Sequence, residues 1–333
     1  MADNPRRDLL KKAAALSIGA IASASNVLPP MEKVFVQSNR SPSAVDFFPG
    51  FTQHTAKTSG ATINFVTAGS GPPVLMLHGY PQTHIMWRKV APQLAQKFTV
   101  VAADLRGYGD SSKPLDGENH FGYSKRAMAQ DQVEVMAGLG FQKFAVVGHD
   151  RGGRVAHRMA LDHPDRVTKV TVLDIVPTYK LLHNVTKEFA TSNYHWFFLI
   201  QKSPFPETLI GNSVELWLKS RFERLPADKL GPDAFAEYLR CFRNPETIHA
   251  SGEDYRAAAS IDLDHDAADL DHKVDCPFLV LWGEFGDMHR QYDVLATWKE
   301  RASNVSGRTV PSGHFIAEQV PENLLAELMK FLS

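Results

Sequence analysis

The stretch that decides the fold runs from residue 144 to residue 154 and reads FAVVGHDRGGR. An apolar run typical of a buried strand ends at Gly148, and a pattern typical of a helix begins after Asp150. Glycine stands two residues before and two residues after Asp150, as a strained turn between a closely packed strand and helix requires. The pattern therefore predicts a nucleophile elbow, G-x-S-x-G, in which Asp150 takes the place of the serine.

Further apolar runs and amphipathic stretches alternate on both sides of this turn. The runs are rich in valine and leucine and are bounded by glycine or charge, which suits strands buried on both faces of a parallel sheet. The expected strands are 73–77, 98–103, 144–147, 167–173, 278–282 and 305–310, and the expected helices are 86–96, 125–139, 153–163, 290–302 and 322–332. This alternation predicts the α/β class, with a mostly parallel sheet flanked by helices.

The alternation is interrupted between residues 177 and 270, where aromatic clusters and helix-like segments replace the strands. We expect residues 177–270 to be an inserted helical cap, and residues 47–176 and 271–333 to form the core. A cap over the carboxyl ends of a parallel sheet lies where open α/β folds bind ligands. The chain has 333 residues, 44% of them hydrophobic, which is enough for a core of this size.

The first residues have the order of an export signal. Arg6 and Arg7 precede an uncharged apolar stretch, and residues 22–24 form a small-x-small site suited to a signal peptidase. The arginine pair, followed by leucine and lysine, resembles a twin-arginine signal. We therefore expect residues 1–24 to direct export to the periplasm or beyond and residues 25–46 to form a tether. The alternative is an N-terminal helix without an address, on a cytoplasmic protein.

The composition excludes several kinds of partner. With 36 basic and 37 acidic residues the net charge is −1, so nothing favours nucleic acid or an anionic surface. No stretch reaches the roughly 18 apolar residues that a membrane span needs. The two cysteines, Cys241 and Cys276, lack metal-type spacing and suggest no disulfide framework. We expect both to be packing thiols, and we expect neither a metal nor a cofactor.

An aspartate at the elbow limits the chemistry. A serine that attacked a saturated carbon would form a stable ether, and the enzyme would stop after one turnover. A carboxylate forms an ester instead, which water can hydrolyse at the ester carbonyl. Asp150 therefore predicts substitution at a saturated carbon, by cleavage of a carbon–halogen bond or by opening of an epoxide.

The partners of such a nucleophile are present in the expected chain order. His314 follows the last expected strand near the C-terminus, where this arrangement places the base that activates water. Two positions are open for the acid that orients this base. Asp174 follows the strand after the nucleophile helix, whereas Asp287, with Glu284 nearby, follows the later strand.

Backbone and side-chain groups beside the nucleophile predict anion binding. The peptide N–H groups of Tyr80 and Arg151 are expected to form an oxyanion hole. Arg151 and Arg154 fall in the first turn of the helix, where cations oppose the helix dipole. An anionic substrate explains them, because the two guanidiniums would grip its carboxylate and hold its α-carbon in line with Asp150. The alternative is that one or both arginines pair with acids of the cap or surface.

These residues resemble the fluoroacetate (haloacetate) dehalogenases, a branch of the α/β-hydrolases related to haloalkane dehalogenases and epoxide hydrolases. The resemblance runs from about residue 47 to the end and includes residues 78–82, 104–109, 148–154, 172–177, 195–196, 254–256 and 313–315. The related enzymes commonly have tryptophan after the nucleophile, where this chain has Arg151. The resemblance implies an α/β-hydrolase fold with Asp150 as nucleophile, His314 as base and Asp174, rather than Asp287, as acid.

The resemblance also implies a site for a small haloacid. Its carboxylate would be held by Arg151 and Arg154, and its halide by His195, Trp196 and Tyr255 from the cap. Those three side chains offer N–H and O–H donors to a departing anion, although His195 and Trp196 taken alone would more often be cap core.

We therefore expect hydrolysis of a haloacetate, such as fluoroacetate or chloroacetate, to glycolate and halide. The partners are then a haloacid and water, and the oligomeric state stays open, with a homodimer as one option. An epoxide hydrolase is the alternative enzyme. A non-catalytic binding protein is the alternative class, although such proteins often lose a triad member and here none is missing.

Overall fold

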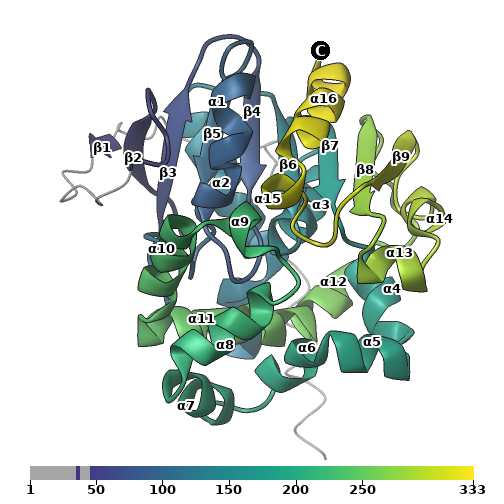
Figure 1. The fold of residues 1–333 in the computed structure, drawn as a ribbon. Coiled ribbons are helices and arrows are strands. Elements are labelled where there is room, and N and C mark those ends of the chain that lie inside the picture. Colours follow the sequence, from purple (N-terminus) through teal and green to yellow (C-terminus); the bar gives the residue numbers. More distant parts are fainter. Residues whose placement is uncertain (1–34, 38–45) are drawn as a thin grey trace, which may run out of the picture. The chain divides into compact units, whose positions relative to one another are not determined.

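The computed structural model describes residues 35–37 and 46–333. Its centre is a nine-stranded sheet with the order β1-β2-β3-β5-β4-β6-β7-β8-β9 (Figure 1). Neighbouring strands are antiparallel from β1 to β5 and parallel from β5 to β9. The strands are β1 (Phe35–Gln37), β2 (Thr52–Lys57), β3 (Thr62–Ala68), β4 (Pro73–Leu77), β5 (Thr99–Ala103), β6 (Phe144–His149), β7 (Val167–Leu173), β8 (Phe278–Gly283) and β9 (Val305–Val310).

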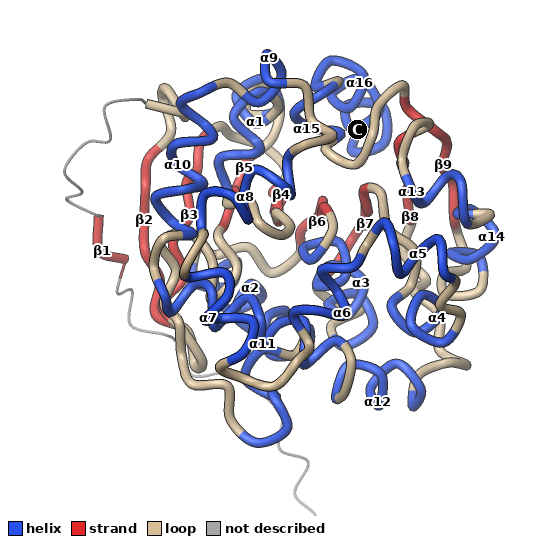
Figure 2. The backbone as a smooth tube through the Cα atoms, turned by 60° about the horizontal axis from the view of Figure 1, so that its bottom comes forward, coloured by secondary structure: helices blue, strands red, loops and turns tan. Residues whose placement is uncertain are grey.

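Helices cover both faces of this sheet. In Figure 1, α1 and α16 lie in front of the strands and α3 lies behind them; Figure 2 shows the same arrangement from below. The predicted α/β fold, with a mostly parallel sheet flanked by helices, is confirmed. The helices of this part are η1 (His84–Lys89), α1 (Ala91–Leu94), η2 (Glu118–Tyr123), α2 (Lys125–Gly138), α3 (Arg151–Asp162), α13 (Asp287–Gln291), α14 (Val294–Lys299), α15 (Ile316–Gln319) and α16 (Pro321–Leu332), where η marks a 3-10 helix.

Two expected helices are each divided in two. The segment 86–96 holds the end of η1 and the short α1, because Pro92 in the first turn of α1 has no N–H with which to continue η1. The segment 290–302 is divided at Tyr292, whose backbone is extended, and Asp293 then caps α14 by accepting a hydrogen bond from the Ala296 N–H. Both divisions follow from local chemistry.

The segment between β7 and β8 contains only helices, which are called the cap helices below. They are α4 (Thr178–His183), α5 (Lys187–Ser192), α6 (Tyr194–Leu199), α7 (Phe205–Gly211), α8 (Val214–Phe222), α9 (Ala227–Leu230), α10 (Pro232–Phe242), α11 (Pro245–Ala258) and α12 (Ile261–Ala268). Several of them gather below the strands in Figure 1, and Figure 2 shows the ends of β4, β6 and β7 surrounded by α6, α8, α11 and α13.

The predicted export signal, residues 1–24, lies outside the described residues, as does most of the predicted tether. Among the described helices, none is both long enough and apolar enough to cross a membrane.

Candidate active site

Asp150 lies at the tip of the sharp turn between β6 and α3. Its φ of 47° and ψ of −112° are rare for a residue with a side chain, so the turn stores backbone strain. The glycines make this turn possible: a Cβ at Gly148 would come within 2.3 Å of the Gly152 oxygen, and one at Gly79 within 2.4 Å of the Asp150 Cβ. The buried carboxylate accepts a hydrogen bond from the Tyr80 N–H, with 2.9 Å between N and Oδ1.

The charges around Asp150 keep it ionised. Burial raises the pKa of its carboxyl, but the positive charges of His314, Arg151 and Arg154 outweigh burial and hold the pKa at about 2. At neutral pH the elbow therefore presents a carboxylate, which is the form that a nucleophile needs.

His314, between β9 and α15, contacts Asp174 through its ring. Nδ1 lies 2.7 Å from Asp174 Oδ2, and the Gly283 N–H donates to Asp174 Oδ1 at 2.9 Å. Burial lowers the pKa of His314, but the hydrogen bond and charge of Asp174, together with the charge of Asp150, raise it further, so that the pKa is above its usual 6.5. Asp174 directly follows β7 and has a positive φ of 51°, like Asp150.

The other acid left open by the sequence does not hydrogen-bond to His314. The Asp287 carboxylate accepts from Arg224 Nη1 at 2.8 Å and from Asn193 Nδ2 at 3.4 Å, and it also pairs with Arg290. These contacts join α13 to the cap helices. Asp174 is thus the carboxylate placed to orient the base.

A second histidine, which the sequence analysis did not single out, hydrogen-bonds to the main chain of His314. His149, the last residue of β6, has Nε2 2.9 Å from the His314 carbonyl oxygen, and the two rings lie 4.6 Å apart. Burial lowers the pKa of His149 to about 4, so its ring is neutral at pH 7 and its N–H donates to that carbonyl. The only sequence signal for this role was its place inside the elbow motif.

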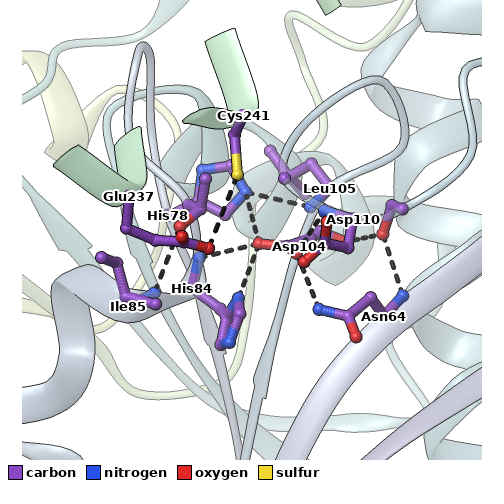
Figure 3. Close-up of polar contacts among 12 residues, drawn as sticks. Asn64, His78, His84, Ile85, Asp104, Leu105, Asp110, Glu237 and Cys241 are labelled. Carbon is purple, nitrogen blue, oxygen red and sulfur yellow. Dashed lines mark hydrogen bonds and ion pairs between the residues drawn. The ribbon is translucent and has the colours of Figure 1, made fainter. Parts of the chain in front are cut away.

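The loop after β4, which carries Tyr80, is held by a buried polar cluster around Asp104 (Figure 3). Asp104 accepts from the His84 N–H at 2.8 Å and from Asn64 Nδ2 at 2.8 Å. The next residue, Leu105, donates its N–H to His78 Nε2 at 3.0 Å, so the His78 proton is on Nδ1, which lies 3.1 Å from the Gly79 oxygen. The cluster thereby fixes the backbone that directs the Tyr80 N–H towards the nucleophile.

Arg151 and Arg154 are both buried beside Asp150, but they are held differently. Arg154 Nη1 donates to the Val176 oxygen at 3.0 Å and to Thr178 Oγ1 at 2.8 Å. Its Nε is buried and has no partner among residues 46–333. Burial and the charge of Arg151 lower the pKa of Arg154 to about 10, which leaves it protonated at neutral pH.

The sequence left open that one or both arginines pair with acids of the cap or surface. Arg151 does pair with an acid of a cap helix. Its Nε and Nη2 donate to Asp254 of α11 at 2.9 and 2.7 Å. Its Nη1 is buried without a partner in the described part of the chain. Arg151 therefore offers one free nitrogen, so a bidentate grip on a carboxylate needs both arginines.

The three expected halide ligands lie together in an aromatic cluster of α6 and α11. The Tyr255 ring lies 5.0 Å from that of Trp196 and 5.8 Å from that of His195. His195 Nδ1 is buried and lacks a partner within residues 46–333, and burial lowers the pKa of this ring well below 6.5. Trp217, which the sequence did not single out, donates to the Tyr80 hydroxyl at 2.6 Å and closes the cluster on the side of α8.

These side chains surround one cavity of about 440 Å³. Its walls include nearly every residue that the sequence placed in the site: Tyr80, Asp150, Arg154, Asp174, His195, Trp196, Tyr255 and His314. The exception is Arg151, which does not line the cavity and has no exposed surface. The arrangement combines an ionised nucleophile, a histidine–aspartate pair, a cation and unpaired N–H donors around one small space, which suits displacement of an anion from a small acid.

Known proteins resemble the chain over most of its length. Residues 72–321 match the family model for the alpha/beta hydrolase fold. The sequence is 45% identical over 289 residues to the fluoroacetate dehalogenase of Burkholderia sp., covering 86% of this chain and 95% of that protein. It is 36% identical over 289 residues to the soluble epoxide hydrolase of Corynebacterium sp. strain C12, covering 85% and 97%.

The chain also resembles solved structures. An alpha/beta hydrolase from Nostoc sp. PCC 7120 is 57% identical, with a TM-score of 0.85, over 86% of this chain and 99% of that one. The chain therefore belongs to the alpha/beta hydrolase fold family and, within that superfamily, to the haloacetate dehalogenase family that includes the Burkholderia fluoroacetate dehalogenase.

Proposed function

We propose that this hydrolase converts a haloacetate, such as fluoroacetate or chloroacetate, to glycolate and halide. One observation carries the proposal: an ionised elbow aspartate, Asp150, lies beside two buried arginines that each keep a nitrogen without a partner among residues 46–333. An unpaired buried guanidinium nitrogen is costly, and a substrate carboxylate would satisfy it. The name of the Burkholderia relative supports the same substrate class.

The first step is displacement at the α-carbon. Oδ1 of Asp150 already accepts a hydrogen bond from the Tyr80 N–H, so Oδ2 is the oxygen left to attack. As the Asp150–carbon bond forms, the carbon–halogen bond breaks and its electron pair leaves with the halide. We assign stabilisation of the halide to the N–H and O–H groups of His195, Trp196 and Tyr255, and we assign the carboxylate grip to Arg151 and Arg154.

The second step is hydrolysis of the ester. His314, oriented by Asp174, takes a proton from a water molecule, and the hydroxide adds to the carbonyl carbon of the Asp150 ester. The carbonyl oxygen of the ester is Oδ1, which already accepts a hydrogen bond from the Tyr80 N–H. The same N–H therefore stabilises the negative charge that develops on Oδ1. Collapse breaks the bond to the glycolate oxygen, which takes the proton from His314, and Asp150 is regenerated.

The deciding experiment incubates the purified protein with fluoroacetate, chloroacetate and a panel of epoxides, and measures released halide and diol. Halide release that is lost in Asp150→Asn supports the proposal. Diol formation without halide release would make the protein an epoxide hydrolase, the activity named for its Corynebacterium relative. In heavy-oxygen water, a single turnover should label Asp150 rather than glycolate, since the first product oxygen comes from the carboxylate.

We further propose that residues 1–24 direct export through a twin-arginine pathway. The sequence order of Arg6 and Arg7, an apolar stretch and small residues supports this. In a bacterium with that pathway, the chain should appear processed outside the cytoplasm, and replacing both arginines by lysine should retain it inside. Full-length active protein confined to the cytoplasm would refute the signal.

A further inference from the structure

A buried charge network joins cap helix α11 to the core directly behind the nucleophile. Asp254 of α11 has no exposed surface, and its Oδ2 accepts from Arg151 Nε at 2.9 Å and from the Tyr108 hydroxyl at 2.6 Å. Its Oδ1 accepts from Arg151 Nη2 at 2.7 Å and from Lys125 Nζ. Burial raises the pKa of the Asp254 carboxyl, but the charges of Arg151 and Lys125 outweigh it and keep the pKa below its usual range.

This network fixes the guanidinium of Arg151 in one orientation. Nη2 also donates to the main-chain oxygen of Asp254 at 2.8 Å. The guanidinium carbon lies 4.3 Å from the centre of the Tyr255 ring and 5.0 Å from that of Trp196. Because two of its three nitrogens are held, the third, Nη1, points in a fixed direction and is the one without a partner among the described residues.

The ionised Asp150 competes with Asp254 for the guanidinium of Arg151. Arg151 follows Asp150 in the chain, and in a buried site two opposite charges at contact distance attract strongly. A guanidinium that turned to Asp150 would neutralise the nucleophile and would no longer be free for a substrate carboxylate. The charge on Asp254 offsets this attraction and keeps Arg151 in place.

We propose that Asp254 is a positioning residue that makes the site specific for carboxylates by holding Arg151 with one nitrogen free. The inference rests on the proposed function and deepens it. Because Asp254 belongs to a cap helix and Arg151 to the core, the carboxylate site is assembled across the boundary between the two. Sequence patterns did not reveal this role, because Asp254 and Arg151 are distant in the chain.

The test is Asp254→Asn, which keeps the shape of the side chain but removes its charge and one acceptor. Losing the fixed contact should raise KM for chloroacetate and the dissociation constant of glycolate about tenfold or more. KM for neutral chloroacetamide should not change. A fall in kcat, caused by Arg151 turning to Asp150, should be equal for the two substrates and smaller than the rise in KM for chloroacetate. Glycolate binding is measured by calorimetry and needs no turnover.

Lys125→Met is the matched control, because it removes another partner of the same carboxylate and leaves the pair with Arg151 intact. It should lower the melting temperature but keep the wild-type KM and glycolate affinity. If Asp254→Asn does not fold because Lys125 loses one of its two buried carboxylate partners, the double variant Lys125→Met/Asp254→Asn removes that charge and should show the same rise in KM.

The outcomes separate the two proposals. Wild-type glycolate affinity in a folded Asp254→Asn protein, or an equal loss in Lys125→Met, would overturn the positioning role and leave the dehalogenase proposal standing. A wild-type protein that neither releases halide from chloroacetate nor binds glycolate would overturn both.

Discussion

Replacing Arg154 by methionine tests the substrate class most directly. Arg154 lines the cavity, is 5% exposed and has no acidic partner among residues 46–333, so its removal leaves no buried carboxylate unpaired. The same change at Arg151 would remove one of the two cations that pair with the buried Asp254, so a loss of binding would be mixed with a loss of stability. Methionine also keeps much of the aliphatic stem of Arg154 and removes only the guanidinium, whose carbon lies 4.8 Å from the centre of the Trp196 ring.

The expected loss follows from the contact that disappears. One charge-assisted hydrogen bond to a carboxylate contributes about 1.5–3 kcal/mol, which is roughly ten- to a hundred-fold in kcat/KM. The nucleophile itself should be unaffected. Asp150 has a pKa of about 2, so even a rise of about two units leaves it ionised at pH 7. Part of the loss should appear in kcat, because the same contact aligns the α-carbon for attack.

The assay compares kcat/KM for chloroacetate and for neutral chloroacetamide, by chloride release. In Arg154→Met, kcat/KM for chloroacetate divided by kcat/KM for chloroacetamide should fall by the same factor, roughly ten- to a hundred-fold. Thr178→Val keeps the charge and removes one of the two hydrogen bonds that orient it, so its effect should be smaller. Equal losses on acid and amide would refute the reasoning, make the arginine structural and move the search to uncharged haloalkanes or epoxides.

Three further predictions concern the two chemical steps. His314→Asn should release about one halide per enzyme and then stall with an ester on Asp150, visible as added mass by intact mass spectrometry; no burst would place His314 in the first step. Because the pKa of His314 is raised, ester hydrolysis should slow as the pH falls through that pKa, while the halide burst stays constant well below it; parallel profiles in rapid-quench experiments would contradict this. Asp174→Asn should reduce turnover much more than Asp287→Asn, because only Asp174 hydrogen-bonds to His314; the reverse order in steady-state kinetics would move the acid to α13.

The sequence predicted the parts of the fold that are determined locally. The elbow around Asp150 was predictable because an apolar strand, two spaced glycines and a helix pattern leave few alternatives. Strands β2 and β3 lie in the antiparallel part of the sheet and were not predicted. The sequence of β2, TQHTAK, is polar, and its pattern of burial is only partial, as an edge region facing water allows.

The candidate site was predicted less completely, because its electrostatics depend on residues distant in the chain. The chemistry of Asp150 and the place of His314 followed from motif and chain order. The choice between Asp174 and Asp287 needed either family resemblance or the contact between Asp174 and His314 in the structure. No periodicity links Asp254 to Arg151, so their ion pair appears only once α11 is placed against α3.

At two positions of positive φ in this enzyme, the residue that catalysis needs is less favourable for stability than glycine would be. Asp150 and Asp174 have φ of 47° and 51°, and such conformations typically cost about 1–3 kcal/mol each for a residue with a side chain. Glycine adopts them freely, so glycine at either position would relieve that cost while deleting the nucleophile or the acid. A screen for heat resistance that scores only whether the protein stays folded would therefore enrich inactive variants at these two codons. Directed evolution of a more stable enzyme has to select for catalytic activity as well.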